Sequence, residues 1–121
     1  PAGTLSYTLT VFDPDAPTGT GFWHWVVFNI PAATTSLAAG FGTTAPPAPI
    51  VEGYTDNGSS GYGGPCPPVG DGPHRYIFTV SALNVAAVPG GATSATTGAG
   101  LTFRTRGTIL AQGTLIGTFS R

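Results

Sequence analysis

The apolar run from Trp23 to Ile30 constrains the fold of this chain more than any other segment. It shows no alternation of apolar and polar residues, and it is rich in aromatic and β-branched side chains. Such a run is typical of a strand that other elements cover on both faces. Pro31 follows directly and fits the end of a strand, because proline cannot continue the hydrogen-bond ladder. The sequence therefore predicts a central strand over 23–30.

Three further segments have the pattern of strands. Residues 5–12 alternate cleanly between two faces, which predicts a half-buried strand. Strands are also expected from about residue 75 to 83 and from about 108 to 119, where β-branched and aromatic residues are enriched. Long helices are nearly absent from the pattern. The expected class is mostly β, an antiparallel β-sandwich with little helix.

The remaining segments are expected to form loops and at most short helices. Residues 33–39 have the composition of a short turn of helix. Ser94 is a suitable N-cap for a helix that reaches toward Arg104, but the Thr and Gly residues between them are poor helix formers. The sequence alone does not decide whether 94–106 is helical. Residues 40–64 show little periodicity and are expected to form a long surface excursion.

Composition limits the function. The chain has 121 residues and no compositional break, so a single domain over 1–121 is expected. The formal net charge is −1 and no basic stripe exists, which argues against nucleic acid as a partner. No apolar run approaches the roughly 20 residues of a transmembrane segment. Cys66 is the single cysteine, which excludes an intrachain disulfide and a multi-cysteine metal site. The absence of Lys and the charged fraction of 7% slightly favour an exported protein over a cytoplasmic one.

Polar side chains are found where the expected strands begin and end. Asp13 and Asp15 follow the first strand, and His24 opens the second. His74 and Tyr76 open the third, after a loop rich in Gly and Pro. If these strands pair in antiparallel fashion, all five side chains reach one edge of the sheet. Imidazole and phenol groups donate hydrogen bonds to oxyanions, so the site would suit phosphate or a phosphate monoester head group.

Two blocks of the chain closely resemble the signature blocks of the phosphatidylethanolamine-binding protein family, in its bacterial and archaeal branch. They read DPDAPTGTGFWHWVVFNIP over 13–31 and YGGPCPPVGDGPHRYIFTVSALNV over 62–85. The ending RGTILAQGTLIGTFSR is similar to the last strand of that family. The resemblance covers most of the chain. It implies a β-sandwich of a large and a small antiparallel sheet with a small anion pocket at one edge.

The resemblance also implies roles for particular residues. With this resemblance we expect a non-enzymatic binding protein with no cofactor and no metal, and a small anionic ligand such as phosphate or a phospholipid head group. By motif match, the ligand-binding residues would be Asp13, Asp15, His24, Pro68, His74 and Tyr76. Arg75 and Cys66 are expected to give structural support, and Arg75 would pair with Asp13 or Asp15.

The chain departs from the family pattern in three places. Relatives carry one or more strands before the position of Pro1, so the chain is expected to be N-terminally shortened, with an open sheet edge. Gly107 and Thr108 stand where many relatives have a Gly-His pair. The segment 90–106, which is helical in relatives, is unusually rich in Thr and Gly.

Two other classes of function stay open at this point. A hydrolase would use Cys66 as a nucleophile with His24 or His74 as base, or a metal held by both histidines and Asp13. A protease-inhibitory or other protein-regulatory module would present the 40–64 excursion to a protein partner. The resemblance does not select the physiological ligand or partner.

Overall fold

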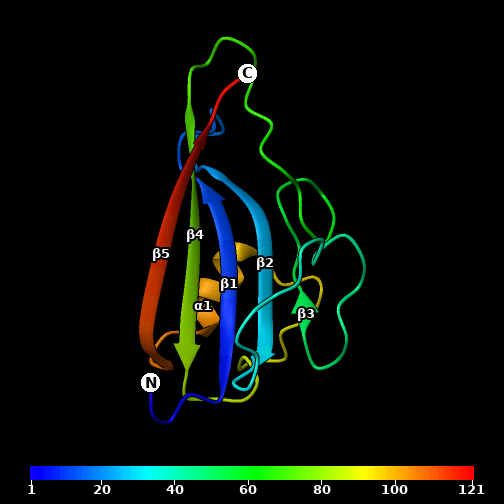
Figure 1. Ribbon diagram of the computed structural model, residues 1–121, viewed down its shortest axis with the longest axis vertical. Coiled ribbons are helices and arrows are strands. Elements are labelled where there is room, and N and C mark those ends of the chain that lie inside the picture. The colour runs from blue at the N-terminus through cyan, green and yellow to red at the C-terminus, as the bar shows by residue number, and fades with distance from the viewer.

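The chain folds around one antiparallel sheet of five strands in the order β3-β2-β1-β4-β5, with a single helix (Figure 1). The computed structural model describes residues 1–121. The strands are β1 Ser6–Asp13, β2 Phe22–Pro31, β3 Val51–Glu52, β4 His74–Leu83 and β5 Ile109–Phe119, and the helix is α1 Gly98–Arg104. The expected mostly β, antiparallel class is confirmed.

The four strands expected from the sequence form within one residue of their predicted ends. β1 is the middle strand of the sheet: Val11 pairs with Trp25 of β2 on one side and with Phe78 of β4 on the other. β3 was not predicted, because its two residues lie inside the irregular 40–64 excursion. That short strand pairs with β2 and forms one edge of the sheet.

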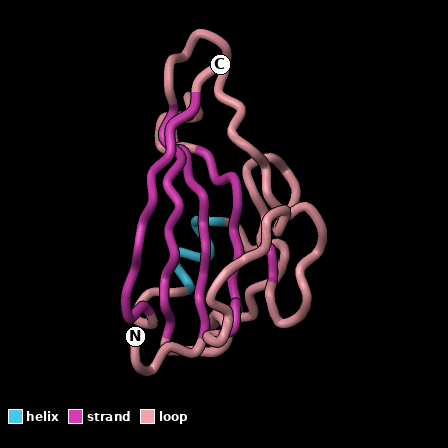
Figure 2. Tube along the Cα trace, viewed as in Figure 1, coloured by secondary structure: helices cyan, strands magenta, loops and turns pink.

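Both faces of β2 are buried, which explains its unbroken apolar run. On one face, Val27 and Trp25 join a cluster that partly buried residues of the 37–50 segment cover. On the other face, Val26 and Phe28 pack with Leu101 of α1. Loops of the 32–64 region run along one side of the sheet and α1 lies on the opposite face (Figure 2). All five strands belong to this single sheet, so loops and α1, rather than a second sheet, supply the covering layers.

Of the two segments considered for short helices, 33–39 and 94–106, only the second contains a helix. The turn of helix expected over 33–39 is wrong: the segment is irregular, because Leu37 packs against the sheet. In the undecided segment 94–106, α1 does form, and its N-cap is Thr97 rather than Ser94. A Cβ at Gly98 would lie 2.2 Å from the Trp23 ring, so this poor helix former allows α1 to approach β2 closely. Tertiary packing outweighs helix propensity here.

β5 is exposed along its whole length, although it pairs with β4 from His74 to Leu83. Apolar side chains are exposed on both faces of the strand, with Leu115 at 71% and Ile116 at 55%. β5 therefore forms an uncovered edge of the sheet. No helix of the chain has the length and hydropathy needed to cross a membrane.

Candidate functional site

An irregularity in β2 places His24 at the site. Val11 of β1 pairs with Trp25, but the next residue, Phe12, pairs with Trp23. His24 is therefore the extra residue of a β-bulge, a feature that redirects a side chain. The centre of its ring lies 5.2 Å from that of Tyr76 in β4 and 4.7 Å from that of Phe22.

His24 is buried and has one defined hydrogen bond. Its Nδ1 donates to the carbonyl oxygen of Gly63, at 3.0 Å. Burial lowers the pKa of His24 below its ordinary value of 6.5, and the bond to Gly63 opposes this only in part. The ring is therefore neutral near pH 7, and because Nδ1 carries the proton, Nε2 presents its lone pair. A ligand that binds Nε2 of the neutral ring must therefore donate a hydrogen bond to it.

Tyr76 presents a hydroxyl group without a partner. Its side chain is 5% exposed, and its phenolic oxygen is buried with no hydrogen-bond partner in the protein. Burial raises the pKa of Tyr76, so the phenol stays protonated and can donate. A buried donor that bonds to nothing costs free energy, on the order of 1–3 kcal/mol. Such a group in a cavity is well suited to an acceptor on a ligand.

His74 is held between two carboxylates. Its Nδ1 lies 2.7 Å from Oδ2 of Asp13, and its Nε2 lies 2.9 Å from Oδ2 of Asp71. The bond to Asp13 is the largest cause that raises the pKa of His74, and the bond to Asp71 adds to it. The other oxygen of Asp13 accepts from the backbone N–H of Asp15, at 2.8 Å. All polar side-chain atoms of His74 and Asp13 are thus hydrogen-bonded within the protein. The two residues therefore help to hold the site in place.

Arg75 pairs with Asp15 outside the cavities. Its Nη2 and Nε donate to the two oxygens of Asp15 at 2.8 and 3.0 Å, and its backbone N–H also donates to Oδ2. The side-chain hydrogen bonds from Arg75 hold the pKa of Asp15 at about 2. Asp15 therefore braces the start of β4, and it lines neither cavity at His24.

Two small cavities meet at His24. One, of about 200 Å³, is lined by His24, Tyr76 and residues of the 62–65 segment and the end of β5. The other, of about 210 Å³, is lined by His24, Asp13, His74 and residues of the 64–68 segment, Pro68 among them. Both are smaller than the roughly 300 Å³ at which pockets for drug-sized ligands begin. The space fits a small group rather than a drug-sized molecule.

Cys66, expected to give structural support, lies at the surface as a free cysteine. The thiol is exposed at the rim of the second cavity, and the next residue, Pro67, is the one that is buried. The carbonyl oxygen of Pro67 accepts a hydrogen bond of 2.7 Å from Nε of Arg121. Cys66 makes no hydrogen bond to either histidine.

The sequence missed three residues of the site. Asp71 had a local signal, since it precedes His74 by three residues in a loop fixed by Gly and Pro. Pro67 and Arg121 had none, because their contact depends on the end of the chain lying against the 62–73 loop, as Figure 1 shows.

Comparison with known proteins agrees with the fold. A family model described as phosphatidylethanolamine-binding protein matches residues 1–120. The chain is 54% identical over 87 residues to YbhB of Escherichia coli, which covers 70% of this chain and 54% of that protein. It is 45% identical over 123 residues to a protein of Aquifex aeolicus, covering 100% of this chain and 69% of that protein. The crystal structure of E. coli YbcL, described as a new member of the mammalian PEBP family, matches with a TM-score of 0.90 and 42% identity, over 100% of this chain and 74% of that one.

The chain therefore belongs to the phosphatidylethanolamine-binding protein family. It spans about half the length of YbhB and of YbcL, whose sequences it covers to 54% and 50%. Proteins of this family are in general non-catalytic binding proteins.

Proposed function

We propose that this chain is a non-enzymatic binding protein for a phosphate-bearing or phospholipid-head-group-like anion, held in the cavities at His24. The observation that carries the proposal is the buried, unpartnered hydroxyl group of Tyr76, whose ring contacts that of His24. A phosphate oxygen would accept from Tyr76, and a P–OH group would donate to Nε2 of His24. Both are bonds that the protein leaves unmade.

The small volume of the cavities and the unpartnered Tyr76 donor support a small ligand with an acceptor group. His74 is hydrogen-bonded to both Asp13 and Asp71, so any positive charge that it carries is balanced by these carboxylates, and its role is to fix the position of Asp13. Burial and the charge of Asp13 raise the pKa of Tyr76 and outweigh the opposing charge of Arg121, so the phenol keeps its proton and can donate it to a ligand oxygen. Pro68 lines the second cavity as a rigid wall. In this proposal His24 and Tyr76 contact the ligand directly, while Asp13 and His74 position the site.

A hydrolase is disfavoured by the geometry. A thiol nucleophile needs a base within hydrogen-bond reach, and Cys66 has no such bond to His24 or His74. His74 has no free ring nitrogen for a metal, because both bind carboxylates. An exported location and a protein partner at residues 40–64 stay predictions that rest on composition alone.

The test is a titration with inorganic phosphate and with phosphoethanolamine, followed by NMR of the imidazole signals. We expect the His24 signal to shift and saturate, and Tyr76→Phe to weaken binding by about tenfold, the effect of one hydrogen bond to a charged group. Tyr62→Phe is the matched control, since Tyr62 lines the same cavity but is exposed. A His24 signal that does not move at millimolar ligand would overturn the proposal.

A further inference from the structure

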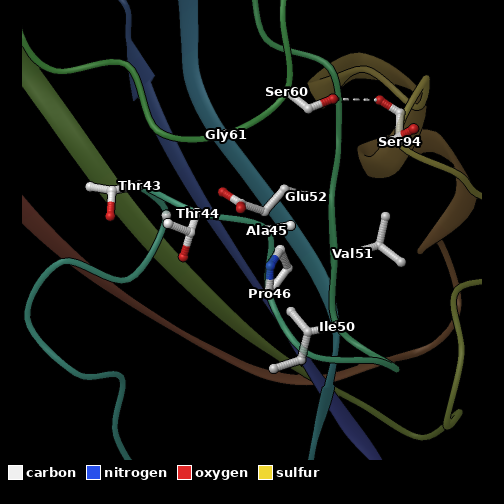
Figure 3. A pocket seen from close by; sticks show the side chains of 11 residues that line it. Thr43, Thr44, Ala45, Pro46, Ile50, Val51, Glu52, Ser60, Gly61 and Ser94 are labelled. Carbon is white, nitrogen blue, oxygen red and sulfur yellow. Dashed lines mark hydrogen bonds between the residues drawn. The ribbon is translucent and has the colours of Figure 1, made fainter.

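A third cavity, an open groove, is lined by none of the residues that line the two cavities at His24. It has a volume of about 420 Å³ and lies between the 42–46 segment, β3 and Ser60–Gly61 (Figure 3). Tyr62 and Gly63, the next residues along the chain, line the first cavity at His24 instead. The segment 60–63 therefore contributes to the lining of both this groove and the first cavity at His24.

A buried carboxylate opens into this groove. Glu52, at the end of β3, is 7% exposed, and Figure 3 shows its carboxylate directed toward the segment that carries Thr43 and Thr44. It receives a single hydrogen bond, from the indole Nε1 of Trp25 to Oε2 at 2.6 Å. None of the ion pairs of the chain includes Glu52. A buried carboxylate has room for about four hydrogen bonds, and burial without a cation is costly.

Two of the four hydroxyl groups that line the groove already donate within the protein, whereas those of Thr44 and Ser94 can donate or accept. The hydroxyl of Thr43 donates to the carbonyl oxygen of Gly40 at 2.7 Å, and that of Ser60 donates to the carbonyl oxygen of Ser94 at 3.0 Å. Because the hydrogen atoms of the Thr43 and Ser60 hydroxyl groups are already donated within the protein, these two groups can only accept hydrogen bonds from a ligand. An ammonium group has three donors and no acceptor, so it matches this set.

The other lining residues match an aliphatic stem. Pro46, Ile50 and Val51 form the apolar part of the groove, below the Glu52 carboxylate in Figure 3. A cationic head on a short hydrocarbon chain buries the chain on apolar surface and keeps the charge at the polar end. A bare metal ion fits less well, because the chain has no group of three or more His, Cys, Asp or Glu that would hold one.

We propose that this groove binds a primary ammonium group on a short aliphatic stem, with Glu52 as its counter-ion. The stem lies along Pro46 and Ile50, and the ammonium donates to Glu52 and to the hydroxyl oxygens of Thr43 and Ser60. The ligand is either a free alkylamine or a lysine side chain, since both present the same chemistry. The site is independent of the proposed anion site.

The test uses the indole N–H signal of Trp25 in a ¹H–¹⁵N NMR spectrum, because that group bonds to Glu52. The chain has two Trp residues, so Trp25→Phe identifies the signal and the Trp23 signal is an internal control. We expect n-pentylammonium to shift the Trp25 signal saturably. Uncharged 1-pentanol should bind at least about tenfold more weakly. Both compounds are titrated into the natural chain, and Trp25→Phe serves only to assign the signal.

Glu52→Gln is the matched variant, because the amide oxygen still accepts from Trp25 while the charge is lost. It should weaken n-pentylammonium binding by about tenfold and leave the response of His24 to phosphate unchanged. Nα-acetyl-lysine amide distinguishes the sources: tighter binding than n-pentylammonium indicates a lysine side chain, and weaker binding indicates a free amine. The proposal is overturned if neither compound moves the Trp25 signal, or if Glu52→Gln binds them as tightly as the natural chain.

Discussion

The residues around His24 differ in how far their polar atoms are already used. Asp13 and His74 have each committed both of their polar atoms to the protein, whereas Tyr76 has a free hydroxyl and His24 a free Nε2. A neutral His24 also means that binding an anion without a proton of its own requires the imidazole to take one up. The site is therefore expected to respond to pH.

Anion affinity should rise as pH falls. Burial lowers the pKa of free His24 below 6.5, so at pH 8 the ring must gain a proton to donate to an oxyanion. Sulfate is the suitable ligand, because its charge is constant over this range. Its affinity should increase by up to about tenfold per unit of pH decrease until the pKa of free His24 is passed. Calorimetry at several pH values measures this, and His24→Gln should flatten the profile; an equally steep profile in that variant would exclude His24 as the group.

His74 should make stability depend on pH. Its pKa is raised in the folded state by Asp13 first and Asp71 second. The stabilisation is therefore complete below the ordinary value of 6.5 and is lost as pH rises through the raised pKa. Asp13→Asn should lower the pKa of His74 and weaken this dependence, as seen by NMR titration and urea unfolding. Asp15→Asn is the control, and a His74 pKa that falls equally in both variants would contradict the assignment.

Removing the hydroxyl of Tyr76 should not destabilise the unliganded protein. The group is buried and unpartnered, so Tyr76→Phe removes a desolvated donor and loses no hydrogen bond. The free energy of unfolding should stay equal or rise by about 1 kcal/mol, while anion binding weakens. Urea unfolding checks this. A loss of more than about 1 kcal/mol would show that the hydroxyl does have a partner in the free protein.

At the scale of elements, α1 shows why propensity was a poor guide. The helix is short and contains two glycines, yet Leu101 is buried and Thr97 caps it by accepting from Gly100. The contact with Trp23 requires a residue without Cβ at Gly98. The glycine that argues against a helix in the sequence is thus the residue that lets the helix dock.

Gly98→Ala should therefore destabilise the protein despite the better helix propensity of Ala. The added methyl would lie 2.2 Å from the Trp23 ring, and overpacking of this kind costs about 1–3 kcal/mol. Gly100→Ala is the control, because its nearest atom is the Thr97 hydroxyl at 3.2 Å, so its cost should be smaller. Thermal or urea unfolding of both variants decides, and a Gly98→Ala protein more stable than the parent would refute the packing argument.

Strand elements were predictable where burial follows a short pattern. Alternation identified β1 and the unbroken apolar run identified β2, because each pattern reflects which faces of the strand are covered. β3 was not predicted, because a strand of two residues is too short to show a periodic pattern of apolar residues. The helix expected over 33–39 failed because Leu37 makes a sheet contact that no local pattern contains.

For the whole molecule, the uncovered β5 should govern association. An edge strand with free backbone groups and exposed apolar side chains pairs readily with another chain. Residues 1–121 expressed alone should self-associate with increasing concentration, and Ile116→Lys should reduce this. Val69→Lys adds the same charge in an exposed loop and should have little effect. Analytical ultracentrifugation tests this; a protein that is monomeric at all concentrations, or equal responses of the two variants, would contradict it.

The sequence by itself determined four of the five strands, the antiparallel class and which polar residues stand where those strands begin and end, because these depend on neighbours a few positions away. Only the tertiary structure decided how those polar residues are used. The contacts of His74 with Asp13, of Arg75 with Asp15 and of Trp25 with Glu52 join residues 61, 60 and 27 positions apart. Strand pairing and bulges set which of these groups meet, and a side chain is free to bind a ligand only when no such partner lies within hydrogen-bond reach.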